Sequence, residues 1–169
     1  MLDWIKSRFT TEDNLPAHWP KKLPLLYCLS SWNYSIVGVY SLYIYYNTML
    51  YEGHFVDSLL LITQGYLSYL GDVHYFGVQH YSRVIDKLLA IAFTTRFITR
   101  FIAYFTGDII ETTIYTVTFS GGMYCYYNSN KSRENFNDYV YWHTLWHFTF
   151  PLGLFVFIYL KTVSSQLAL

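Results

Sequence analysis

The chain has 169 residues, of which 53% are apolar and only 13% are charged, and its 11 basic residues balance its 11 acidic ones. Charged side chains are absent from three stretches, 23–51, 112–130 and 139–160, and each approaches or exceeds the roughly 20 apolar residues that a helix needs to cross a bilayer. This pattern excludes a water-soluble globular protein. The absence of a basic tract excludes nucleic acid as a partner.

Residues 1–22 are the first expected element, an interfacial N-terminal segment in which Trp4 and Trp19 suit the headgroup region. The segment contains acidic residues and lacks the apolar core of a secretory signal peptide. Beyond it, Cys28 and Cys125 both lie in apolar stretches, which favours two buried thiols over a disulfide.

Five membrane-spanning helices are expected next, over about 24–47, 55–75, 84–105, 108–127 and 139–160, because backbone groups in lipid must bond within their own segment. Basic residues occur in the N-terminal segment and in the second and fourth connections, but not in the first and third. This alternation predicts that the N-terminus lies on the positively charged side. The predicted fold is an all-α polytopic bundle, with a single domain over residues 23–162 and a tail over residues 163–169.

This topology brings three helix ends to one side of the membrane, and those ends carry Asp72, Asp86, His143 and His147, with Ser68 one turn deeper than Asp72. Polar groups at such a depth are expensive unless they pair, line water or bind an ion. His143 and His147 are four residues apart and project from one helical face. That spacing suits two ligands of one Zn²⁺, with a carboxylate from another helix as the third. The alternative is a pair of interfacial histidines that bond to tyrosine or backbone groups.

The segment HTLWHFTFPLG at 143–153 resembles the last-helix motif of the alkaline ceramidases, which reads H-x-x-W-H before a run of small residues that contains Gly. This resemblance implies a membrane hydrolase with a seven-helix bundle and a zinc ion held by three histidines. His143 and His147 match the last-helix pair, Ser68 matches the serine of the second helix, and Asp86 matches the aspartate that supports the zinc-bound water. The third histidine is replaced by Asp72, and the chain has room for five spans instead of seven.

These departures leave two hypotheses for the function. In the first, the chain is an accessory, largely structural subunit of a larger membrane complex in an organelle such as the mitochondrial inner membrane. Its ceramidase-like metal site is then degenerate, its partners are other membrane subunits and lipids, and five helices leave one side open for those neighbours. In the second, it is an active zinc-dependent amide hydrolase that acts on a ceramide-like lipid. Asp72, His143 and His147 would then bind the metal, Asp86 would act on water, and Ser68 would stabilise the oxyanion.

Arg96 and Arg100 lie four residues apart within the third expected span. One interpretation pairs them with Asp108 or Glu111 at the start of the next helix. The other assigns them to an anionic lipid headgroup. Haem is not expected, because two histidines on one face of a helix cannot ligate both sides of the macrocycle, and no phosphate-binding glycine loop predicts a nucleotide.

Overall fold

The computed structural model describes residues 19–20, 22–48, 52–78, 80–103 and 108–167. Within these ranges the fold is all-α, as the sequence predicts, and no strand occurs. The elements are α2 (Leu25–Ser30), α3 (Asn33–Thr48), α4 (Glu52–Tyr69), a short π-helix η1 (Leu70–His74), α5 (Tyr81–Ala103), α6 (Ile109–Lys131) and α7 (Phe136–Leu167).

The helix boundaries follow local chemistry. Pro24, whose ring presets a backbone angle that suits a helix start, directly precedes α2. Asp108 caps α6, where its Oδ1 accepts a hydrogen bond from the backbone N–H of Glu111 at 2.9 Å. The first expected span differs from the structure, because the turn at Ser31 and Trp32 divides it into α2 and α3.

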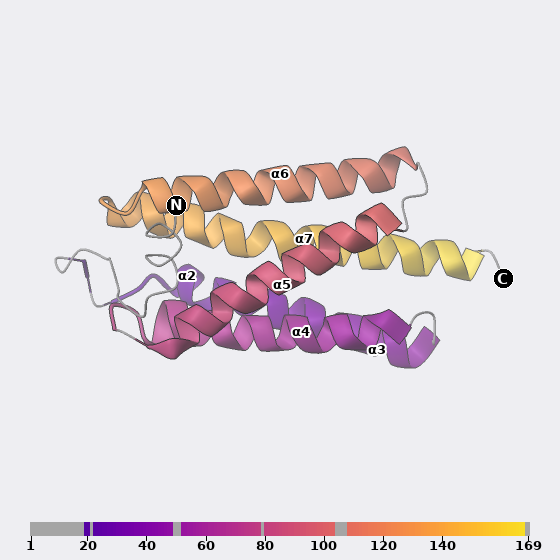
Figure 1. The fold of residues 1–169 in the computed structure, drawn as a ribbon, viewed down its shortest axis with the longest axis horizontal. Coiled ribbons are helices and arrows are strands. Elements are labelled where there is room, and N and C mark those ends of the chain that lie inside the picture. The colour runs from indigo at the N-terminus through magenta and orange to yellow at the C-terminus, as the bar shows by residue number, and fades with distance from the viewer. Residues whose placement is uncertain (1–18, 21, 49–51, 79, 104–107, 168–169) are drawn as a thin grey trace.

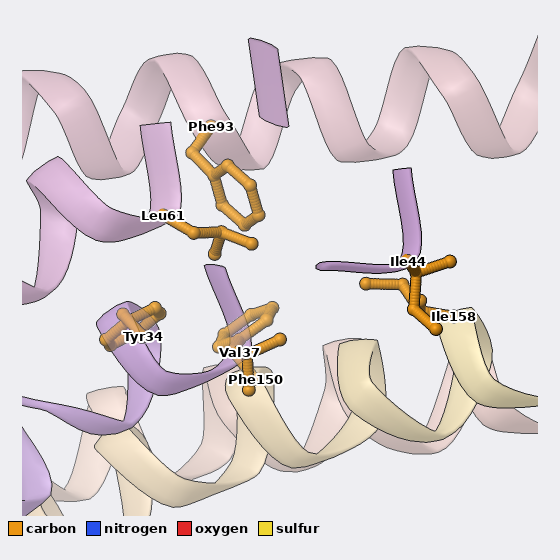
Figure 2. Packing of buried hydrophobic residues seen from close by; sticks show 7 residues of the cluster. All are labelled: Tyr34, Val37, Ile44, Leu61, Phe93, Phe150 and Ile158. Atoms are coloured by element: carbon orange, nitrogen blue, oxygen red, sulfur yellow. The ribbon is translucent and has the colours of Figure 1, made fainter. Parts of the chain in front are cut away.

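Two antiparallel hairpins, α3–α4 and α6–α7, form the body of the bundle (Figure 1). Helix α5 packs on α4 and η1 at its start and crosses diagonally, so that Phe97 of α5 reaches Tyr115 of α6 with a distance of 4.6 Å between ring centroids. Helices α3 and α7 join the hairpins. Figure 2 shows the buried core where they meet, which consists of Tyr34, Val37, Ile44, Leu61, Phe93, Phe150 and Ile158.

Close packing of α6 on α7 depends on glycine. A Cβ atom at Gly122 would meet the ring of Phe150, and one at Gly153 would meet the side chain of Thr118. A Cβ atom at Gly121 would lie 3.5 Å from Thr149, an ordinary contact. Gly122 therefore allows the close approach of α6 to α7.

Large apolar side chains cover much of the outer surface, among them Leu25, Ile36, Val39, Ile102 and Ile109, each more than half exposed. By length and composition, one described helix is apolar enough to cross a membrane, namely α7 over Phe136–Leu160, with a mean hydropathy of 1.3. Cys28 and Cys125 are free thiols. The N-terminal segment up to residue 18, including Trp4, lies outside the described residues.

Candidate metal centre

Asp72, His143 and His147 lie close enough to hold one metal ion. One ligand atom from each lies within 4.8 Å of the other two. Nε2 of His143 is 3.1 Å and Nε2 of His147 is 3.4 Å from the same oxygen, Oδ2 of Asp72. The three side chains are largely buried, with exposures of 15%, 15% and 3% for Asp72, His143 and His147.

Helix geometry explains why these side chains meet. The four-residue spacing of His143 and His147 puts both imidazoles on one face of α7, with 4.6 Å between their centroids. Asp72 lies in the middle of η1, the π-helical turn that continues α4. Single π-helical turns inside helices are frequent at functional sites. Arg83 of α5 donates from Nε to the carbonyl oxygen of Gly71 at 2.9 Å, which ties this turn to the start of α5.

Ser68 joins the cluster from the turn before Asp72. Its Oγ donates to Oδ2 of Asp72 at 3.1 Å and lies 3.3 Å from Nε2 of His147. The serine that the sequence places one turn below Asp72 is therefore in direct contact with two of the three candidate ligands.

The hydrogen bonds of Ser30 assign the tautomer of His147. Ser30 Oγ donates its single hydrogen to the carbonyl oxygen of Tyr27 at 2.7 Å, so at 3.2 Å from Nδ1 of His147 it acts as an acceptor. The neutral imidazole then carries its hydrogen on Nδ1, and the lone pair of Nε2 faces Ser68 and Asp72. Two acceptors, Nε2 of His147 and Oδ2 of Asp72, thus face each other, and a cation between them would satisfy both.

His143 is oriented by α6, the other helix of its own hairpin, and by aromatic neighbours. Its Nδ1 lies 3.1 Å from Oγ of Ser129 on α6, so both imidazoles direct Nε2 at Asp72 and have Nδ1 beside a serine. The ring of Tyr139 stacks on His143 with 5.1 Å between centroids, and Tyr27 lies at 5.5 Å. Outside this layer, Trp19 is buried against Tyr139.

Pro151 adds a further link between α3 and the site. Proline has no N–H, so the carbonyl oxygen of His147, four residues earlier, loses its usual helical partner. Asn33 Nδ2 donates to that carbonyl oxygen at 3.5 Å. The backbone beside the second histidine is therefore held by the first turn of α3.

Asp86 lies beside the cluster without joining the three ligands. Its Oδ1 accepts a hydrogen bond from Nε2 of Gln64 at 2.7 Å, and Gln64 is one turn before Ser68 on α4. The other amide atom of Gln64, Oε1, is buried and has no hydrogen-bond partner among the described residues. Asp86 therefore neighbours the site through α4, whereas the sequence groups it with Asp72 and the two histidines as a fourth possible ligand.

Arg96 pairs with Asp57 of α4 through its Nε. One interpretation of the sequence expects Asp108 or Glu111 as the partner, and the structure differs from it. The reason is that α5 packs on α4, which carries Asp57. The side chain of Arg100 lies outside the described residues.

Sequence reasoning missed four residues that contact or support the cluster: Ser30, Ser31, Gln64 and Ser129. Ser30, Ser31 and Gln64 are polar residues inside largely apolar stretches, and that was the available signal. Ser129 lies two residues before Lys131 and gave no such signal. Comparison of the chain with protein-family models, with curated proteins and with solved structures found no match.

The donor set suits a transition metal. Zinc accepts imidazole nitrogen and carboxylate oxygen, and a site with three protein ligands keeps a position for a further ligand. Two histidines and one carboxylate also form a set that binds Fe(II). Nε2 of His147 has a lone pair and lies 3.4 Å from a carboxylate oxygen, and this arrangement suits either Zn²⁺ or Fe(II) as the bound ion.

Proposed function

We propose that this chain is a multi-pass membrane protein that binds zinc through Asp72, His143 and His147 and hydrolyses an amide bond in a ceramide-like lipid. The observation that carries the proposal is the convergence of both Nε2 atoms on Oδ2 of Asp72, with each Nδ1 beside a serine. A hydrogen-bond partner on the second ring nitrogen orients an imidazole toward a metal in known centres, and the serine hydroxyls are such partners here.

Helix lengths and surface composition support the membrane location. Helices α5 and α6 each have 23 residues and α7 has 32, and at 1.5 Å per residue each is longer than the roughly 30 Å hydrocarbon core. Exposed side chains such as Ile36, Ile102 and Ile109 would be costly in water and are favourable in lipid.

The residues around the ligands suit hydrolysis. Zinc, when bound, polarises a carbonyl group and acidifies water. Gln64 holds Oδ1 of Asp86, and the second carboxylate oxygen is the acceptor for a proton from water. Ser68 has a hydroxyl beside two of the ligands, and rotation of its hydrogen away from Oδ2 of Asp72 would let it donate to an oxyanion that develops on the substrate.

The substrate class rests on the resemblance of the segment at 143–153 to the alkaline ceramidases. The buried location of the ligands, within helices rather than on an exposed loop, supports a substrate that enters from the bilayer. Asp72 in place of a third histidine reduces the positive charge of the site, so the bound water should be less acidic than in a three-histidine centre.

The test is metal analysis combined with an activity assay on the full chain in detergent micelles. We expect one zinc per chain, with iron and manganese measured in parallel, and release of fatty acid from a ceramide-like amide. The double variant His143→Ala/His147→Ala should lose both metal and activity. His74→Ala is the matched control, because His74 lies on the same π-helical turn and is exposed, and it should retain both. Zinc content that is equal in the double variant and the control would refute the proposal.

A second candidate is an accessory structural subunit of a membrane complex. The observation that favours it is the exposed aromatic surface of α6, where Tyr124 and Tyr127 are 59% and 64% exposed, since Tyr supplies large contact areas for protein neighbours. Gentle solubilisation from the native membrane distinguishes the two. Stable co-purification with other membrane chains, without zinc, supports the accessory subunit, whereas isolation of a zinc-containing, active chain supports the hydrolase.

A further inference from the structure

The bundle has a second polar region, far from the metal ligands. A cavity of about 50 Å³ lies where all five long helices meet, and each contributes to its lining. The lining includes Ser41 of α3, Asp57 of α4, Phe93 and Arg96 of α5, Tyr115 of α6 and Ile158 of α7. Ile158 is 11 residues beyond His147 on α7, which corresponds to about 16 Å along the helix.

Two features show that this cavity has donors to offer. Ser41 is 1% exposed, and its Oγ has no hydrogen-bond partner among the described residues, although it lines the cavity. Arg96 pairs with Asp57 through Nε, and this contact uses one of the five N–H donors of the guanidinium. A buried hydroxyl without a partner is destabilising, so a ligand that accepts a hydrogen bond from it is favoured.

We propose that this cavity is an oxyanion-binding site that receives the carboxylate or phosphate headgroup of an anionic lipid, with Arg96 and Ser41 as donors. A guanidinium binds oxyanions with two parallel hydrogen bonds, and the contact of Asp57 with Nε leaves the two Nη nitrogens of Arg96 for such a pair. The charge of Arg96 excludes a metal cation. The volume admits a group of a few atoms, and neither a sugar nor a nucleotide fits.

The surroundings favour a lipid over a free anion. Arg96 is 35% exposed, so the site is open to the outside on the α5 face. The outward face of α5 is apolar, with Ile91, Ile98 and Ile102 53%, 37% and 70% exposed, so acyl chains would surround the helix that carries Arg96. The aromatic pairs Phe97–Tyr115 and Tyr115–Phe157, at 4.6 and 4.9 Å, close the cavity on the side of α6 and α7.

The inference requires no hydrolytic activity, and its test reads lipid binding alone. The full chain is purified in nanodiscs of phosphatidylcholine, with or without phosphatidic acid, and lipid retention is measured by native mass spectrometry after transfer to detergent. Thermal unfolding is followed in parallel with added oleate or inorganic phosphate. We expect selective retention of phosphatidic acid and a higher Tm with oleate. A rise with inorganic phosphate equal to that with oleate would assign the site to a free oxyanion and overturn the lipid source.

Two variants locate the binding. Ser41→Ala removes the unpartnered hydroxyl and should weaken retention of the anionic lipid about tenfold, while the lipid-free protein unfolds at an equal or higher temperature. Arg96→Gln should weaken it by at least as much, and Lys131→Gln, which removes an exposed charge at the end of α6, should not. Because Arg96→Gln leaves Asp57 without this partner and can impair folding, Ser41→Ala is the decisive variant. Unchanged retention in Ser41→Ala, or equal retention of phosphatidylcholine, would overturn the proposal.

Discussion

This bundle has two polar regions, the candidate metal centre and the cavity lined by Arg96 and Ser41, and their buried polar groups are arranged in different ways. At the end formed by η1 and the first half of α7, polar side chains contact one another around a single atom, Oδ2 of Asp72. At the other end, an ion pair and an unpartnered serine line a cavity. Polar groups within an apolar bundle must pair or bind a ligand. The first region brings ligand atoms together for an ion, and the second leaves space for a molecule.

The largest expected effect is a loss of zinc affinity at the first region, the candidate metal centre. Asp72→Ala removes the one oxygen that both imidazoles and Ser68 share. We expect zinc affinity to fall by more than the roughly 100-fold that loss of a supporting partner causes, because a ligand itself is lost. Competition with a chromogenic zinc chelator measures the affinity. Asp57→Asn is the matched control, since it changes a carboxylate in the second region, and a similar loss of zinc there would show that the two regions are not independent.

The next largest effect concerns the serines that lie beside the Nδ1 atoms of the two histidines in the first region. Ser30→Ala and Ser129→Ala each remove the hydroxyl beside one Nδ1, and each should lower zinc affinity about 10- to 100-fold without abolishing binding. Ser31→Ala should have a smaller effect, because its Oγ lies farther from Nδ1 of His147, at 3.5 Å. The same chelator competition ranks the three variants. A loss in Ser31→Ala equal to that in Ser30→Ala would contradict the assignment of Ser30 as the main acceptor for the Nδ1 hydrogen of His147.

The predictions from sequence succeeded where contacts depend on helical periodicity. Residues four apart face the same way on any helix, so the pairs His143 with His147 and Ser68 with Asp72 could be placed together before the structure was known. The expectation that the end of the second span, where η1 lies, and the start of the fifth span, α7, are on the same side came from counting helices and basic connections, and it brings Asp72 to the two histidines.

Contacts that depend on which helix lies beside which could not be predicted in the same way. The sequence interpretation paired Arg96 with Asp108 or Glu111 because those acids lie at the start of the next helix, but α5 packs on α4 and the partner is Asp57, 39 residues away. Periodicity places Gln64 on a face of α4 but does not show that α5 presents Asp86 to it.

The smallest expected effect concerns the packing of α6 on α7, two helices that contribute residues to both polar regions. Gly122→Ala forces a Cβ atom against the ring of Phe150, and overpacking of this kind costs about 1–3 kcal/mol of unfolding free energy. Gly121→Ala is the matched control, because its Cβ meets Thr149 at an ordinary 3.5 Å and alanine favours the helix by about 1 kcal/mol over glycine. Thermal unfolding in detergent should therefore show a lower Tm for Gly122→Ala and an unchanged or higher Tm for Gly121→Ala. Zinc affinity and lipid retention, measured well below the Tm, should be unchanged in both. If Gly122→Ala lowered zinc affinity as strongly as Ser129→Ala does, the metal ligands would depend on the spacing of α6 and α7, and the two regions would have to be treated as one coupled unit.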